Sequence, residues 1–486
     1  MNSLTPSLPS CLTNHYLEPK HPTIAAYRNN PLIGALGPVL TGDEITSLLT
    51  RRPSYDPSER KLPPHLKAHA IYALRSLVVP TPMHKAIVQE VGVILRQGYV
   101  HRNPLSPSYS RMIALDRPAL KQGILPPERF RNVPLLGSAA MGTAGTGKTM
   151  GFDIAVSTYP QVIDHCYELN GVRVAFKQVT WLKINLFQDA SLKAFGIEFF
   201  EKLGEAVGEN LRRDWGVDAC NGNNVQPLIY RACREYNLGL LIVDELQNMV
   251  SHSKGYKAVL SYFIRMMNCL GLPIAVIGTN AAGALMQTDA AAARRFISGI
   301  PPFRPLASGP LWRGFLEEVW HLQYTKEATT LDETLEKQIH ELTGGVPDLV
   351  IKLYCLTQTR LFGRKNERLT KGILDETAAD LFHTIKDRIL ELKGRTIDTA
   401  RIQEQRERLD KQYKELTHKE EVRLGAQPTS WETSTQGPVF VGEENIEEST
   451  ISDPPPAQNE MIQASRAKDK KAALAKLGIL RAQPSE

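Results

Sequence analysis

The chain has 486 residues, of which 42% are hydrophobic and 23% charged, so it can bury a sizeable core and is not wholly disordered. Lys and Arg together number 58 against 52 Asp and Glu, which gives a formal net charge of +6. This mild excess of positive charge permits a nucleic-acid partner but does not require one.

Cysteine spacing and hydropathy indicate a protein of a reducing compartment. The six cysteines are scattered, and no two form a Cys-x-x-Cys pair, which argues against a zinc ribbon or a disulfide framework. The apolar runs have the length of strands and are much shorter than the roughly 20 residues that span a bilayer. The N-terminus, MNSLTPSLPS, has no basic segment followed by an apolar one, so we expect no signal peptide. We therefore expect a cytoplasmic protein that does not enter a membrane.

Composition and periodicity divide the chain into four parts. Residues 1–125 form an N-terminal extension, expected to dock a partner, that begins with a Pro- and Ser-rich arm and becomes helical near residue 65. Residues 126–310 alternate short apolar runs with longer helical stretches, which is typical of a parallel α/β sheet. Residues 311–390 follow a helical pattern, and residues 391–486 form a charged tail.

Individual elements follow from the same patterns. In the extension, one helical face carries four apolar residues: Ile87, Val91, Ile94 and Leu95. In the α/β part, the apolar runs predict strands at Leu136–Met141, Thr180–Asn185, Leu238–Asp244 and Ile274–Thr279.

The tail has a marked division of charge. Between Ser430 and Ser465 there are seven acidic residues and no Lys or Arg, whereas residues 466–481 contain six basic residues and one Asp. Two interpretations stay open. The segment is either a solvated linker with a frayed helix, or a tether that carries a short partner-binding peptide and folds when bound.

The strongest motif in the chain is GTAGTGKT, at residues 142–149. It matches G-x-x-x-x-G-K-[ST] at every fixed position and follows an apolar run, as a phosphate loop does. Its glycines allow successive backbone N–H groups to turn inward around phosphates, and the next helix directs its N-terminus at them. Lys148 would reach the β- and γ-phosphates, and the Thr149 hydroxyl would hold Mg²⁺. The other candidate nucleotide-binding residues of the loop are Gly142, Thr143, Gly145, Thr146 and Gly147.

A second motif indicates catalysis. The apolar run LGLLIVDELQ ends in adjacent carboxylates, Asp244 and Glu245, and an unpaired charge at the end of a buried strand is costly. In an enzyme with a phosphate loop, the first acid supports Mg²⁺. The second can polarise the attacking water. Glu245 therefore predicts hydrolysis of the nucleotide and not binding alone.

Two further pairs complete the candidate site. The run PIAVIGTN ends in Thr279 and Asn280, either of which could sense the γ-phosphate. Farther along the chain, Arg294 and Arg295 are candidates for an arginine finger that reaches the nucleotide of a neighbouring subunit. The sequence does not decide which member of either pair acts.

These motifs occur in the order typical of AAA+ ATPases, and the chain resembles the AAA+ regulators of Tn-seven-type transposons, the TnsC family, which is related to TniB. The resemblance covers roughly residues 24–380. It is carried by segments outside the nucleotide motifs as well: AAYRNNPLIGAL, GYVHRNP, TYPQVI, WLKI, SLKAF and GGVPDLVIKLY.

The resemblance implies a parallel AAA+ sheet with a helical lid, and ATP and Mg²⁺ as cofactors. It also implies homo-oligomeric rings or filaments on double-stranded DNA, with little sequence preference. Such proteins link a target-selector protein (TniQ- or TnsD-like) to transposase subunits, and ATP hydrolysis disassembles the polymer. By resemblance, the tail contacts a transposase subunit. The corresponding DNA-contacting region offers Lys183, Gln188, Ser191 and Lys193.

One departure from the AAA+ pattern concerns the lid. Asp348 stands where many AAA+ lids place a basic second-sensor residue, and Lys352, one turn later, is a candidate substitute.

Three alternative functions stay open: a secretion-type AAA+ protein, a signalling NTPase that does not bind DNA, and a DNA scaffold that binds nucleotide without turnover. Glu245 and the arginine pair argue against the third.

Overall fold

The computed structural model describes residues 24–133, 137–169, 172–186, 191–249, 253–287, 289–383 and 389. All of them belong to the first of the two units into which the chain divides, Met1–Ile397. The predicted tail lies outside the described residues. In the part of the chain that is described, no helix has the length and apolar character needed to cross a bilayer.

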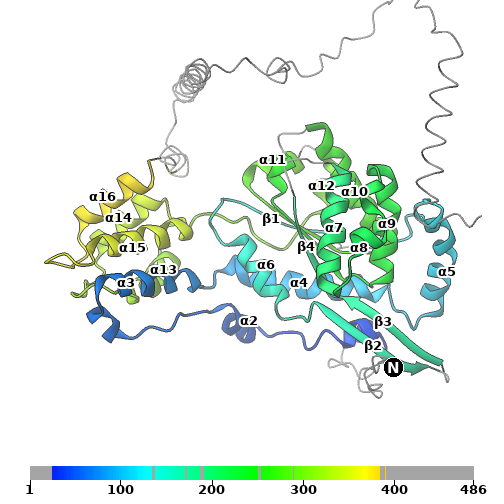
Figure 1. The fold of residues 1–486 in the computed structure, drawn as a ribbon, viewed down its shortest axis with the longest axis horizontal. Helices are drawn as coiled ribbons and strands as arrows, with labels where there is room; N and C mark the ends of the chain where they lie inside the picture. Colours follow the sequence, from blue (N-terminus) through cyan, green and yellow to red (C-terminus); the bar gives the residue numbers. More distant parts are fainter. Residues whose placement is uncertain are drawn as a thin grey trace, which may run out of the picture. The chain divides into compact units, whose positions relative to one another are not determined.

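A four-stranded parallel sheet forms the centre of the fold (Figure 1). Its order is β1-β6-β5-β4, and its strands are β1 (Gly137–Met141), β4 (Trp181–Asn185), β5 (Leu240–Asp244) and β6 (Ile274–Gly278). The predicted strands and the predicted α/β fold class are thus confirmed. All four strands begin and end within two residues of the expected positions.

Helices cover both faces of this sheet, which explains why its strands are apolar runs and do not alternate with polar residues. On one face, Leu241 and Val243 of β5 pack against three helices: α7 (Leu192–Val207), α9 (Gly222–Glu235) and α10 (Ser253–Leu270). On the other face, Leu240 and Ile242 pack against α4 (Pro82–Val100) and α6 (Lys148–Val156) (Figure 1).

Helix α4 comes from the N-terminal region, yet it forms a layer of the core. Thr81 caps its N-terminus by accepting a hydrogen bond from the His84 backbone, and Pro82 occupies the first turn, where a missing N–H costs nothing. All four apolar residues of the face expected from the sequence are buried against the sheet and α6: Ile87, Val91, Ile94 and Leu95.

Residues 162–179 form a hairpin that the sequence analysis did not predict. Strand β2 (Val162–Leu169) pairs antiparallel with β3 (Val172–Val179), in a separate two-stranded sheet. Its strands, VIDHCYEL and VRVAFKQV, interrupt their apolar residues with charged and polar ones, unlike the continuous apolar runs of the central strands. It leads into β4 through Thr180, whose buried hydroxyl donates to the backbone carbonyl of Pro160.

Four helices form the lid: α13 (Pro310–His321), α14 (Glu333–Thr343), α15 (Pro347–Leu361) and α16 (Lys371–Leu381). Their apolar core surrounds Trp312 and Tyr354, and it also takes in Ile71 and Leu74 from the short helix η3 (Ile71–Ser76). The N-terminal segment therefore contributes to the cores of both the sheet and the lid.

The remaining elements are short or lie at the edges. Before the sheet they are η1 (Ala25–Tyr27), α1 (Pro31–Gly34), α2 (Gly42–Leu49), η2 (Pro57–Lys61), α3 (Pro64–Ala70) and α5 (Pro107–Lys121). Within the α/β part they are α8 (Leu211–Asp214), η4 (Val217–Ala219), η5 (Leu246–Met249), α11 (Asn280–Gln287) and α12 (Ala290–Arg295).

A fully buried ion pair joins the N-terminal segment to the lid. Lys67 of α3 donates to the carboxylate of Glu367, and both side chains are excluded from solvent. Glu367 also accepts hydrogen bonds from the backbone N–H groups of Gly363 and Lys326. Burial alone would raise the pKa of Glu367, but the hydrogen bonds from Lys67 and the backbone lower it overall. Glu367 is thus ionised at neutral pH.

Breaking this pair should strongly destabilise the protein. We expect Lys67→Met to lower the free energy of unfolding by about 3–5 kcal/mol, because Glu367 is left charged and buried. Urea unfolding measures this loss, with the exposed Lys365→Met as control.

Because the pKa of Glu367 is lowered in the folded state, the stabilisation in the unsubstituted protein is present at neutral pH and lost as the pH falls through that pKa.

The double variant Lys67→Met/Glu367→Gln should recover part of the loss. The oxygen of the neutral amide can still accept from one of the two backbone N–H groups, and no charge is left buried. If Lys67→Met unfolds at the same urea concentration as Lys365→Met, the buried pair does not hold the N-terminal segment to the lid.

Candidate functional site

The predicted phosphate loop lies between β1 and α6, where the local geometry requires glycine. Gly142 and Gly147 adopt positive φ angles, +150° and +91°. A Cβ atom on Gly142 would lie 2.0 Å from the backbone oxygen of Phe303, which accepts a hydrogen bond from the Thr143 N–H at 2.8 Å. The base of the loop therefore lies so close to the Phe303 backbone that only glycine fits at position 142.

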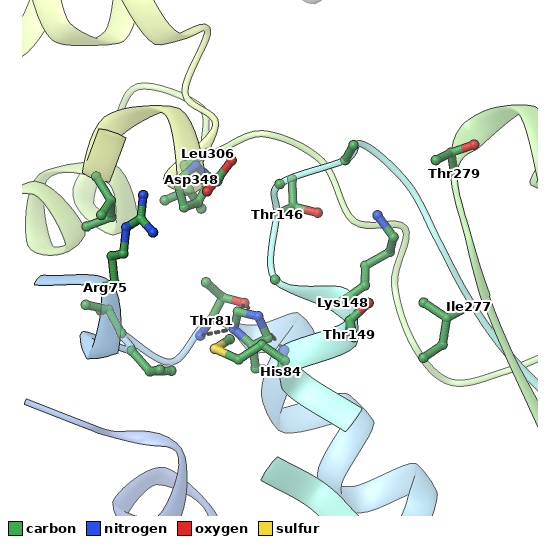
Figure 2. Close-up of a pocket in the computed structure, with 18 of the residues that line it drawn as sticks. Arg75, Thr81, His84, Thr146, Lys148, Thr149, Ile277, Thr279, Leu306 and Asp348 are labelled. Atoms are coloured by element: carbon green, nitrogen blue, oxygen red, sulfur yellow. Dashed lines mark hydrogen bonds between the residues drawn. The ribbon is translucent and has the colours of Figure 1, made fainter. Parts of the chain in front are cut away.

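The loop borders a cavity of about 580 Å³. Its other walls are the carboxyl ends of β5 and β6, the start of lid helix α15, and the N-terminal segment that leads into α4. Figure 2 shows Lys148 and Thr279 across the cavity from Arg75 and Asp348. Of the predicted nucleotide-binding residues, seven line the cavity directly: Gly145, Thr146, Gly147, Lys148, Thr149, Asp244 and Thr279.

Lys148 places a nearly buried positive charge in this cavity. Its side chain donates to the backbone oxygens of Thr143 at 2.7 Å and Gly142 at 3.1 Å, and the residue is only 8% exposed. Burial lowers the pKa of Lys148, while the carboxylates of Asp244 and Glu245 oppose that shift. An anionic ligand such as a phosphate would add favourable interactions with this charge.

Thr149 and Asp244 provide oxygen ligands of the kind that Mg²⁺ prefers. The Thr149 hydroxyl donates to Asp244 Oδ2 at 2.9 Å, so a hydroxyl and a carboxylate from different elements lie together at the loop. Magnesium in nucleotide sites is usually held by one or two such groups together with phosphates and waters. The residues present therefore fit this ion. Among the described residues there is no cluster of three or more His, Cys, Asp and Glu that could hold a metal by itself.

Glu245 has an unusual backbone conformation. Its φ angle is +61°, a left-handed value that costs a non-glycine residue about 1 kcal/mol or more. The conformation is supported by the Glu245 N–H, which donates to Asp244 Oδ1 at 2.8 Å, and by the Asn248 N–H, which donates to the Glu245 carbonyl at 2.9 Å. Strain held in this way turns the Glu245 carboxylate into the cavity, directly after the end of β5.

Gln247 is a site residue that the sequence analysis missed. Its side-chain amide donates to the Glu245 carboxylate, and its Oε1 accepts from the Thr279 N–H at 3.1 Å. It therefore connects the acid that follows β5 with the residue that follows β6. Only its position two residues after Glu245 could have drawn attention to it, because its second partner is 32 residues away in the chain.

The structure distinguishes the members of the two open pairs. Thr279 lines the cavity, whereas Asn280 is the exposed first residue of α11 and does not line it. Arg295 donates to the carbonyl of Arg131 at 2.7 Å. Arg294 is exposed, and its guanidinium has no recorded partner within the described residues. Neither arginine lines the cavity of its own subunit.

His84, on α4, is a second residue that the sequence did not single out. It is 4% exposed and lines the cavity below the phosphate loop (Figure 2). Its Nδ1 accepts from the Thr81 backbone N–H at 3.3 Å, and within the described residues its Nε2 has no hydrogen-bond partner. Burial lowers the pKa of His84, which favours the neutral ring. The N-terminal segment thus supports the loop from beneath.

The lid also touches the phosphate loop. The Asp348 N–H at the start of α15 donates to the Gly145 carbonyl at 3.2 Å. The candidate second-sensor substitute, Lys352, donates to Asp348 Oδ2 at 2.6 Å, and both residues line the cavity. The positive charge of Lys352 is therefore paired within the lid.

The four candidate DNA contacts have different environments. Lys183 lies beside the nucleotide site, with its ammonium 2.6 Å from Asp153 Oδ1 and 3.8 Å from Asp244 Oδ2. Its charge is engaged there and is not free on an outer surface. Ser191 caps α7, and Lys193 is exposed and donates to the Asp218 carbonyl at 3.3 Å. Gln188 lies outside the described residues.

Comparison with known proteins agrees with this geometry. Residues 138–286 match the family model described as "AAA domain". The chain therefore contains an AAA+ nucleotide-binding domain of the P-loop type, and ATP is the nucleotide that this family implies. No curated protein matches the chain.

Three solved structures are similar over half of the chain or more. A Walker-type ATPase of Pyrococcus abyssi is 13% identical over 53% of this chain and 71% of its own, with a TM-score of 0.35. Cdc6p from Pyrobaculum aerophilum is 14% identical over 60% and 87%, with a TM-score of 0.31. PCH-2 from C. elegans is 11% identical over 65% and 74%, with a TM-score of 0.31. Similarities this low carry no argument about activity or partners.

The contact between the loop and His84 can be tested with a single methyl group. A Cβ atom on Gly147 would lie 2.6 Å from His84 Nε2, in a residue whose φ angle already disfavours a side chain. We expect Gly147→Ala to weaken the binding of a fluorescent ATP analogue by at least about tenfold, because the added methyl group would push the loop away from His84 and displace the backbone N–H groups that face the phosphates.

Gly208→Ala is the matched control. Gly208 also has a positive φ angle, +75°, but a Cβ atom there would meet nothing within 4 Å. Equal affinity of the two variants for the analogue would mean that the packing of His84 against the loop does not constrain nucleotide binding.

Proposed function

We propose that this protein is an AAA+ ATPase that assembles on double-stranded DNA in an ATP-dependent way and links a target-selector protein to a transposase. ATP hydrolysis would disassemble the polymer and so control target choice in DNA transposition. The ATPase part is carried by one observation. Lys148, Asp244 and Glu245, each with a distinct role in phosphate chemistry, converge on a single cavity. The DNA and transposition part is supported by the sequence resemblance.

The residues of the cavity suit hydrolysis of the γ-phosphate. Lys148 would balance the charge of the phosphates, and the Thr149 hydroxyl and the Asp244 carboxylate would hold Mg²⁺. When bound, this ion neutralises negative charge on the β- and γ-phosphates. The Glu245 carboxylate would orient a water molecule and accept its proton. As the water oxygen bonds to the γ-phosphorus, the bond from that phosphorus to the bridging oxygen breaks, and ADP leaves with the electron pair.

Gln247 gives Glu245 a link to Thr279. Because its amide contacts both, a displacement of Thr279 by the γ-phosphate would alter the position of the Glu245 carboxylate. Loss of the γ-phosphate would release that constraint. The site could in this way report the nucleotide state to the rest of the fold.

Assembly would complete the site. Arg294, exposed at the end of α12 and without a recorded partner in the described part of the chain, is the better candidate for a finger that reaches a neighbouring nucleotide. Arg295 is engaged with the Arg131 carbonyl of its own chain. A finger that acts between subunits would make hydrolysis depend on the polymer.

Removing the Lys148 charge should uncouple the protein from nucleotide. We expect Lys148→Ala to lose ATP binding and, with it, ATP-dependent assembly on duplex DNA. Negative-stain imaging with DNA and a slowly hydrolysed ATP analogue, compared with ADP, measures the assembly. The exposed Lys365→Ala, which removes an equal charge, should assemble like the unsubstituted protein.

Three outcomes would contradict parts of this proposal. Assembly of Lys148→Ala on DNA would exclude a nucleotide switch. Assembly of the unsubstituted protein with nucleotide but without DNA would favour the alternative, a signalling or secretion-type AAA+ NTPase. Absence of any assembly would contradict the polymer model.

Glu245→Gln should separate binding from hydrolysis. The amide retains the shape of the side chain but cannot accept the proton of water, so we expect ATP turnover to fall about 100-fold or more. ATP binding should persist, and DNA-bound polymers should form with ATP itself and fail to disassemble. The control is Glu341→Gln, at an exposed position on α14 outside the cavity. Normal turnover in Glu245→Gln would remove this residue from the hydrolytic role.

A further inference from the structure

A second cavity lies between helices α5 and α9 and has a strongly cationic lining. Its volume is about 330 Å³. Four of its lining residues are cations, two from each helix, and one is an acid: Arg117, Lys121, Arg231, Arg234 and Glu235. The lining thus carries an excess of three positive charges, and it shares no residue with the nucleotide cavity.

Two of these cations are fixed in place by their surroundings. The side chain of Arg234 is 8% exposed, with Nη2 2.7 Å from Asp116 Oδ2, and its Nη1 has no hydrogen-bond partner among the described residues. Arg231 lies over the ring of Trp215, 4.4 Å from its centroid, and its Nε donates to Glu235 at 3.3 Å. Asp116 and its second partner, Arg129, both lie outside the lining. Their opposite charges cancel, so the excess of three positive charges at the cleft is unchanged.

The other two cations have no such compensation. Arg117 and Lys121 lie four residues apart on α5, both are exposed, and the structure records no ion pair for either within the described residues. Like charges at this helical spacing repel each other and destabilise a helix. Their repulsion, next to Arg231 and Arg234 on α9, would be relieved by a bound anion.

We propose that this cleft holds the phosphate backbone of DNA. Three of its four cations are arginines, whose planar guanidinium groups match two oxygens of one phosphate, and two of the arginines are pre-oriented by contacts within the fold. Lys183, by contrast, lies beside the nucleotide site, with its ammonium 2.6 Å from Asp153 Oδ1 and 3.8 Å from Asp244 Oδ2. The assignment rests on the proposed DNA binding and specifies a surface for it.

Reversing the two exposed charges tests the assignment. The variant Arg117→Glu/Lys121→Glu is compared with Arg364→Glu/Lys365→Glu, which makes the same charge change at two exposed residues after α15 that lie outside the cleft. Fluorescence anisotropy measures binding to a short labelled DNA duplex, with a slowly hydrolysed ATP analogue, over a range of salt concentrations. Binding of a fluorescent ATP analogue by each variant reports that the nucleotide domain is folded.

We expect the cleft variant to bind DNA at least about tenfold more weakly than the control variant. Each lost phosphate contact means that about one counterion fewer is released on binding. The slope of log affinity against log salt concentration, which is negative, should therefore become shallower by about two. If the cleft variant fails to bind the ATP analogue, the milder Arg117→Gln/Lys121→Gln takes its place, with a smaller expected loss in the same direction.

The outcomes separate this assignment from the proposed function. If the unsubstituted protein binds DNA and both variants bind it equally well, the cleft assignment is wrong and the proposed function stands. If the unsubstituted protein does not bind DNA with any nucleotide, the proposed function and the assignment both fall.

A synthetic peptide of the acidic segment 442–460 serves as a competitor. If it binds the unsubstituted protein but not the cleft variant, while DNA binds both equally, the cleft binds an acidic peptide instead.

Discussion

The parallel alignment of β1, β5 and β6 is the constraint on which the site depends. Parallel strands place their carboxyl ends at one edge of the sheet, so the phosphate loop, the Asp244–Glu245 pair and Thr279 meet there although they are far apart in the chain. Burial on both faces fixes the register of these strands, because a slip would exchange the side chains of the two faces. The precision of the site therefore derives from the packing of the sheet.

The N-terminal segment ties this edge to the lid. Helix α4 packs under the sheet and brings His84 beneath the phosphate loop, while η3 enters the apolar core of the lid. Lys67 adds a buried ion pair with Glu367 between the same two parts. A partner that pulls on residues 64–84 would therefore act on the loop and on the lid together. Under the proposed function, this connection would give a target selector that docks on the N-terminal segment a physical route to the nucleotide.

Electrostatics separates the nucleotide cavity from the α5–α9 cleft. In the nucleotide cavity, Lys148 donates to loop carbonyls and Lys352 pairs with Asp348, while Arg75 lies over the ring of Tyr72. In the cleft, the four cations outnumber the single acid by three charges. The first arrangement suits a ligand that arrives with its own Mg²⁺, whereas the second suits a polyanion that releases counterions when it binds. ATP and DNA would then meet the protein at distinct surfaces coupled through the core.

The sequence by itself determined the features that local pattern encodes. The four central strands are apolar runs because they are buried on both faces, and the phosphate loop needs glycines because its backbone turns toward the ligand. Strands β2 and β3 left only a weaker signal, the dipeptide Asn170-Gly171 that is common in tight turns, because polar residues interrupt their apolar ones. Tertiary structure alone decided the positions of His84, Gln247 and Lys183 and the existence of the cationic cleft. Each of these depends on contacts between elements far apart in the chain, and a local pattern carries no information about such contacts.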